Sequence, residues 1–149
     1  MAIITMLKAI KEVHSKSVVL IKIGGFYHAY GKDAYILSYF FGYKIKKIEG
    51  GCANCGFPIN SISKVKVKLE DSKINYILLD RRNNYEEDEK FDLKNLNKYA
   101  EIYEKARKYV NLKNRIESIY EILLDDVNKE ELTEKIIRIE EIVYERRKI

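Results

Sequence analysis

An aromatic cluster follows two glycines near the start of the chain, in the stretch GGFYHAYGKDAY. Phe26 and His28 are two residues apart, so in an extended strand they lie on one face while Tyr27 lies on the other. Aromatic rings on an open face stack on flat groups such as nucleobases, and histidine donates, accepts or stacks without a fixed negative charge. Phe26 and His28 are therefore candidate contact residues, with ordinary packing in a sheet as the open alternative. Tyr27 is expected in the core in either case.

Positive charge is concentrated in the same part of the chain. Residues 1–80 contain 12 lysines, no arginine and 6 acidic residues, whereas residues 81–149 contain 16 basic and 17 acidic residues. A local basic surplus favours a polyanionic partner, although a general richness in lysine explains the same counts. The candidate phosphate contacts are Lys44, Lys46, Lys47, Lys64, Lys68, Arg81 and Arg82.

Metal or catalytic chemistry has little support in the sequence. Cys52 and Cys55 form a CxxC that His14 and His28 would have to complete, and the sequence has no histidine pair at zinc-finger spacing. No helix is expected to begin at this motif, so a redox role is disfavoured as well. The sequence shows no nucleophile–base pair, phosphate-binding glycine loop or metal-spaced carboxylate cluster. We therefore expect neither a cofactor nor an enzyme.

The elements expected to position these residues alternate between helix and strand up to residue 80. Such alternation predicts an α/β domain over residues 1–82, with a mixed β-sheet flanked by helices. Gly42 is expected to end the second helix in a left-handed conformation. The expected elements are helix 3–15, strands 17–23 and 26–30, helix 32–41, strand 43–49, a turn beginning at Gly50 and Gly51 after which residues 52–58 return the chain, a helix capped by Asn60 or Ser61, and strand 74–80.

The remainder of the chain has a different character. Residues 83–94 are polar and are expected to form a connector, and residues 95–149 are expected to form an amphipathic helical extension, either a hairpin or long helices. Residues 111–114 mark either a break or a shift of register, and Asn128 is expected to cap the last helix. The apolar stripes of this helical extension must be buried on each other, on the sheet domain, on a second copy or on another protein. They are Leu96, Tyr99, Tyr103, Ala106 and Val110; Leu112, Ile116, Ile119, Leu123 and Val127; and Leu132, Ile136, Ile139 and Val143.

Hydropathy and the N-terminal residues favour a cytoplasmic protein. The longest apolar runs, VVLIKI and YILSYFF, are far shorter than the roughly 20 residues that a membrane span needs. The first residues lack the features of a signal peptide, and two cysteines without an export signal favour a reducing compartment.

Two motifs in register resemble domain I, the N-terminal mismatch-recognition domain, of MutS proteins. VVLIKIGGFYHAYGKDAYILS is similar to the family's strand, its Gly-Asp-Phe-Tyr-Glu motif and the helix start that follows. CGFPINSISKVKVKLEDSKINYILLD is similar to the family's Ala-Gly-Ile-Pro-Tyr-His hairpin, helix and next strand. The resemblance covers about residues 3–80, and the sequence has no Walker A motif, so it implies a stand-alone version of this domain without an ATPase.

The resemblance implies a role for Phe26 and a change at His28. In MutS the corresponding phenylalanine stacks on an unpaired base and the glutamate hydrogen-bonds that base. Here Phe26 keeps the stacking group, worth about 1–3 kcal/mol per base, but His28 occupies the glutamate position and Gly25 the aspartate position. We expect a shift from mismatch discrimination towards general nucleic-acid binding.

Stand-alone domains of this type resemble accessory proteins of diversity-generating retroelements. This implies a non-catalytic accessory that binds RNA or DNA and a reverse transcriptase during mutagenic retrohoming, with possible homo-oligomers through the C-terminal helices. One alternative is a stand-alone binder of DNA structures or mismatches in repair or recombination; another is a protein-interaction module without nucleic-acid contact. The sequence leaves open the choice of RNA or DNA, the oligomeric state and any residual mismatch selectivity.

Overall fold

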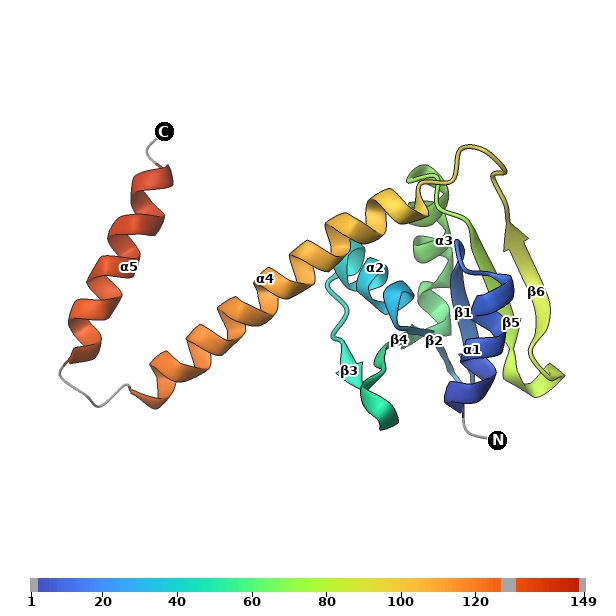
Figure 1. Ribbon diagram of the computed structural model, residues 1–149, viewed down its shortest axis with the longest axis horizontal. Helices are drawn as coiled ribbons and strands as arrows, with labels where there is room; N and C mark the ends of the chain where they lie inside the picture. Colours follow the sequence, from blue (N-terminus) through green and yellow to red (C-terminus); the bar gives the residue numbers. More distant parts are fainter. Residues whose placement is uncertain (1–2, 127–130, 148–149) are drawn as a thin grey trace. The chain divides into compact units, whose positions relative to one another are not determined.

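A computed structural model describes residues 3–126 and 131–147 of the 149-residue chain. It contains two compact units, Met1–Val110 and Asn111–Ile149. The first unit has a six-stranded mixed sheet with helices packed against it, as predicted (Figure 1). Among the described helices, none is long and apolar enough to cross a membrane.

The sheet has the strand order β3-β4-β2-β1-β5-β6. Strands β1 and β5 are parallel, and every other neighbouring pair is antiparallel. The β1–β2 connection is a tight hairpin, because Gly24 takes a φ of 60° that few side chains tolerate. The strands are β1 (Val18–Ile23), β2 (Phe26–Tyr30), β3 (Lys46–Lys47), β4 (Ala53–Pro58), β5 (Tyr76–Asp80) and β6 (Glu86–Phe91).

Helices connect the strands and continue beyond the sheet. The α-helices are α1 (Ile3–Val13), α2 (Lys32–Phe41), α3 (Ile62–Asp71), α4 (Tyr99–Asp125) and α5 (Glu131–Arg147). Short 3-10 helices occupy Glu49–Gly51, Ile59–Ser61 and Arg81–Asn83. Helix α2 ends at Gly42, whose φ of 71° is the left-handed conformation that the sequence predicts.

One side of the sheet is the helix-covered face. Strand residues such as Leu20, Tyr27 and Phe57 are buried there against α2, α3 and the first turns of α4. Val65 and Leu69 supply the contact from α3, as the helical periodicity predicts. Each such side chain contributes roughly 1.5–3 kcal/mol on full burial, so this face holds most of the core.

The other side is the open face, and a helix covers only part of it. Leu7 of α1 packs over a small cluster on β1 and β5 that includes Ile21 and Leu79. Figure 1 shows α1 beside these two strands. Phe26 on β2 and Gly56 on β4 are exposed, so the half of this face formed by β2 and β4 is accessible.

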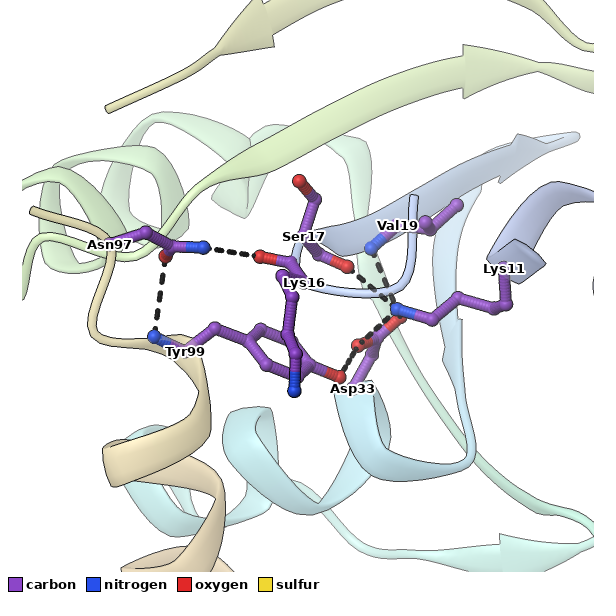
Figure 2. A network of polar contacts seen from close by, with 7 residues as sticks. All are labelled: Lys11, Lys16, Ser17, Val19, Asp33, Asn97 and Tyr99. Atoms are coloured by element: carbon purple, nitrogen blue, oxygen red, sulfur yellow. Dashed lines mark hydrogen bonds and ion pairs between the residues drawn. The ribbon is translucent and has the colours of Figure 1, made fainter. Parts of the chain in front are cut away.

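A buried polar network connects α1, β1, α2 and α4 in the first unit (Figure 2). The carboxylate of Asp33 is 1% exposed and accepts hydrogen bonds from the Lys11 ammonium at 3.1 Å, the Val19 amide at 3.1 Å and the Tyr99 hydroxyl at 2.6 Å. Burial raises the pKa of Asp33, and the Lys11 ammonium opposes that rise. Asn97 accepts from the Tyr99 amide and donates to the Lys16 carbonyl, which fixes the start of α4.

Two segments differ from the predicted elements. The strand expected over 43–49 is reduced to Lys46–Lys47, because a 3-10 helix with positive φ at Gly50 and Gly51 takes over at Glu49. Residues 83–94, expected as a connector, contain strand β6, which pairs with β5. An edge strand tolerates charged side chains on both faces, so the sequence EEDEKF lacks the alternation that identifies a strand.

Helix α4 is continuous across residues 111–114, where the sequence left a break open. It begins at Tyr99 instead of residue 95, so Leu96 precedes the helix and is exposed. Tyr99, Ala106 and Val110 are buried as predicted. Val127 and the expected cap Asn128 lie outside the described residues.

Candidate nucleic-acid interface

Strand β2 places three rings in a line on the open face. Phe26, His28 and Tyr30 alternate with Tyr27 and Ala29, which point into the core of the helix-covered face. The ring centroids of Phe26 and His28 are 6.5 Å apart, and those of His28 and Tyr30 are 6.2 Å apart with planes 22° from parallel. We call these three residues the aromatic row. Phe26 is 49% exposed and Tyr27 is 5% exposed, which confirms the predicted alternation.

Strand β4 forms the floor beside the aromatic row. Pro58, Gly56 and Asn54 lie opposite Phe26, His28 and Tyr30 in the antiparallel register. A Cβ atom on Gly56 would lie 3.2 Å from the His28 ring, so the glycine lets this ring lie close over β4.

His28 is oriented by a polar neighbour. Its Nδ1 lies 3.4 Å from Oδ1 of Asn54. With this oxygen as the acceptor, Nδ1 is the donor nitrogen of the contact.

The β1–β2 hairpin fixes Phe26 at the end of the row. The amide of Ile59 donates to the carbonyl of Gly25 at 3.1 Å, which holds the hairpin against the segment after β4. The backbone that carries the exposed ring is therefore restrained on both sides, by β1 and by β4.

Two of the predicted basic residues lie near the aromatic row. Lys46 is opposite Asn54, which is opposite Tyr30, so all three share the open face. Burial raises the pKa of Tyr30 to about 12, Tyr85 adds to the rise, and the charge of Arg81 opposes it. The side chain of Arg81 is exposed.

Other predicted basic residues lie elsewhere. Lys64 and Lys68 belong to α3 on the helix-covered face, where their ammonium groups lie over the rings of Phe41 and Phe40 at 5.4 and 5.2 Å. Lys47 is opposite Ala53, whose side chain packs against the core of that same face. The structure therefore divides the predicted lysines between the two sides of the sheet.

The remaining two basic residues lie outside the row. Lys44 is exposed in the irregular segment before β3, and Arg82 is exposed near Asp80, with 4.0 Å between Nε and Oδ1.

The two cysteines do not form a common site. Cys55 points into the core of the helix-covered face, 2% exposed, where its thiol lies 3.9 Å from the Ala34 carbonyl. Burial raises its pKa to about 12, which disfavours the thiolate that a metal requires. Cys52 is half-buried and lines a cavity on the open face with Tyr30. Within residues 3–126 and 131–147, no three His, Cys, Asp or Glu side chains gather as metal ligands.

Three members of this site were not identified from the sequence. Tyr30 continues the period of two that begins at Phe26, so the alternation contained its signal. Asn54 and Gly56 are brought to the row by the register between β2 and β4. Strand register depends on tertiary pairing, and no local pattern in the sequence indicates it.

Comparison with known proteins identifies the family of the first part of the chain. The family profile of MutS domain I matches residues 2–82, just over half of the chain. Among curated proteins, none matches the chain significantly. The family match supports nucleic-acid binding of the mismatch-recognition kind, and it spans the strands that carry the aromatic row. The chain belongs to the MutS domain I family.

Proposed function

We propose that this protein binds nucleic acid at unpaired nucleotides, through the aromatic row and the basic side chains beside it. The observation that carries the proposal is the exposed ring of Phe26, at the end of a row whose other two rings are partly buried, on a half of the sheet that α1 leaves accessible. Sheets with exposed aromatic side chains bind single strands in the same physical way, one base to a ring.

The spacing of the row favours an extended strand over a stacked one. Successive bases in a stacked strand are about 3.4 Å apart, whereas the ring centroids are 6.5 and 6.2 Å apart. A strand whose bases follow these rings must therefore open its base–base stacking. A regular duplex cannot do so without losing its own stacking energy, so unpaired or distorted segments are the expected ligand.

The charges on this face suit a polyanion. Lys46 shares the open face with the row, Arg81 is exposed, and His28 stands where the family has a glutamate. A carboxylate would repel phosphates unless a specific base donor satisfied it. With histidine at this position, we expect binding with little dependence on base identity.

A fluorescence anisotropy titration tests the proposal. Labelled single strands of DNA and RNA, a smooth duplex, and the same duplex with one unpaired nucleotide are compared over a series of salt concentrations. Phe26→Ala should weaken binding to the single strands and the unpaired nucleotide about tenfold, with less effect on the smooth duplex. The matched control is Val67→Ala, which removes an exposed apolar side chain from α3.

Equal losses on all ligands would contradict stacking. No affinity for any nucleic acid would leave the alternative of a protein-interaction module.

We further propose a non-catalytic accessory role beside a reverse transcriptase in a diversity-generating retroelement. The support is the likeness to accessory proteins of that kind, together with apolar helical residues in the second unit that remain exposed. These include Leu112, Ile116, Ile119, Ile122, Leu124, Ile137, Ile139, Ile142 and Val143. Large exposed apolar faces mark sites of protein association, either with the enzyme or with a second copy.

Co-expression with a reverse transcriptase encoded beside the gene tests this role. Retention of the enzyme by the full chain, and its loss in Ile116→Glu but not in Phe26→Ala, would support it. Sedimentation of the full chain alone reports whether the same substitution dissolves a homo-oligomer. Nucleic-acid binding without any enzyme partner would favour the alternative of a binder of DNA structures in repair or recombination.

A further inference from the structure

A cavity of about 590 Å³ lies at the end of the aromatic row. Its walls come from α1, from β1 and β2, and from the two loops at Gly31 and Gly50. Ile4, Leu7 and Val19 supply much of its apolar lining. The volume is in the range of about 300–1,000 Å³ that is typical of small-ligand sites.

The cavity is continuous with the proposed interface because Tyr30 belongs to both. Tyr30 lines the cavity, and its ring is stacked beside His28 in the row. We propose that the cavity receives one nucleobase, the next along the strand after the base on Tyr30. This inference rests on the proposed function, and it extends the site from three nucleotides to four.

The lining fits a flat heteroaromatic ring. A nucleobase buries its faces against apolar side chains, and Ile4, Leu7 and Val19 offer such surfaces. Lys8 lines the cavity and is exposed, so its ammonium is available to the phosphate that accompanies the base.

The other two lysines of the lining already have partners within the protein. Lys11 is bound to both oxygens of Asp33 at 3.1 Å and to the Ser17 carbonyl at 2.7 Å. The ammonium of Lys32 lies over the Tyr103 ring at 5.0 Å. Lys8 is therefore the lysine of this cavity that we expect to contact the strand.

The polar groups of the lining predict weak base selectivity. Asp33 is the carboxylate in the wall, and each of its oxygens already accepts two hydrogen bonds from Lys11, Val19 and Tyr99. A saturated carboxylate does not read the donor edge of a base. We therefore expect the cavity to accept any of the four bases.

A series of short oligonucleotides of increasing length tests the inference. Affinities of oligothymidylates from two to six nucleotides are measured by NMR titration with the full chain. In the unchanged protein the step from three to four nucleotides should raise the affinity about tenfold. A four-nucleotide ligand whose terminal residue is abasic should lose this gain, because the base and not the phosphate occupies the cavity.

Cys52→Phe fills the cavity from its wall and keeps all three residues of the aromatic row. This variant should lose the step between three and four nucleotides and keep the dependence on Phe26. Cys52→Ala is the matched control and should keep the step. If Cys52→Phe does not fold, Ser15→Phe fills the same cavity from the turn after α1.

The inference is overturned if a folded variant with a filled cavity still gains affinity from three to four nucleotides, or if the ligand with the abasic terminus keeps this gain. In either case the proposed function stands. If Phe26→Ala leaves the affinity for every oligonucleotide of the series unchanged, both the inference and the proposed function are overturned.

Discussion

The two faces of the sheet contain the same kinds of residue and differ in their accessibility. On the helix-covered face, Phe41 stacks on Tyr43 at 5.2 Å and Tyr43 on Phe57 at 5.5 Å. On the open face, Phe26 and His28 have a ring neighbour along the strand, and Phe26 is half exposed. A cluster of aromatic and basic residues therefore does not identify an interface by itself. The interface is identified by whether a helix packs over the cluster or leaves it accessible.

The lysines make the same distinction. The ammonium of Lys64 lies 5.4 Å from the Phe41 ring and 5.7 Å from the Tyr43 ring, in cation–π contacts within the protein. Such contacts contribute about 0.5–1 kcal/mol at exposed sites, and a phosphate would have to compete with them. Lys46 on the open face is exposed, and its strand β3 is at the edge of the sheet. We expect Lys46 to contribute to nucleic-acid binding and Lys64 to contribute to the stability of the fold.

The largest predicted contrast is between two adjacent residues of β2. Tyr27→Ala should lower the free energy of unfolding by about 3–5 kcal/mol, because it leaves a cavity in the core. Phe26→Ala should change it by less than about 0.5 kcal/mol, because this ring is half exposed. Denaturant titration measures both values. A large loss of stability in Phe26→Ala would mean that the open face is part of the core.

The sequence alone predicted the fold well where periodicity is strong. Helices α1 and α2 and strands β1, β2 and β5 lie within two residues of the expected bounds, because their apolar residues recur with helical or alternating spacing. Strand β6 escaped prediction because pairing with β5 specifies it, and its side chains are charged. Backbone pairing overrides propensity at such an edge.

The candidate site was predictable only in part. Alternation placed Phe26 and His28 together, since a strand has a period of two. The division of Lys46 from Lys64 depends on which face α3 covers, and that follows from the chain crossing over the sheet. The cavity beside Tyr30 is lined by residues from α1, β1 and the segment around Gly50, which are far apart in the sequence, so no local pattern describes it.

Charge reversal on the two faces should affect nucleic-acid binding unequally. Lys46→Glu should weaken binding to a single strand about tenfold and lower the slope of affinity against salt, because a phosphate contact becomes a repulsion. Lys68→Glu makes the same change of charge on the helix-covered face. Its effect should be less than about twofold in anisotropy titrations. Similar losses in both variants would indicate attraction by net charge alone.

The buried Cys55 on the helix-covered face should make the free energy of unfolding depend on pH. The pKa of the buried Cys55 thiol is raised to about 12 from about 9, so the folded state holds this proton more tightly than the unfolded state. Its contribution is complete below pH 9 and is lost as the pH rises from 9 towards 12. At pH 10 the loss should be about 1 kcal/mol.

Cys55→Ala removes this part of the pH dependence. Between pH 8 and 10 the unfolding free energy of this variant should therefore fall less than that of the unchanged protein. Iodoacetamide should modify Cys52, which is half-buried, before Cys55. Rapid modification of Cys55 in the folded Cys52→Ala variant would contradict its burial.

The smallest predicted effect concerns Gly56. Gly56→Ala places a methyl group 3.2 Å from the His28 ring, so the ring must shift by a few tenths of an ångström away from β4. Because Asn54 holds the ring only by a 3.4 Å contact, we expect the shift to disturb stacking without unfolding the sheet. Affinity for a single strand should fall about threefold, and the His28 ring resonances should move in an NMR spectrum.

The double variant Gly56→Ala with His28→Ala should bind as weakly as His28→Ala alone, since the methyl group then has no ring to displace. Additive losses would instead place the effect of Gly56 in the backbone of β4 and not in the position of the His28 ring.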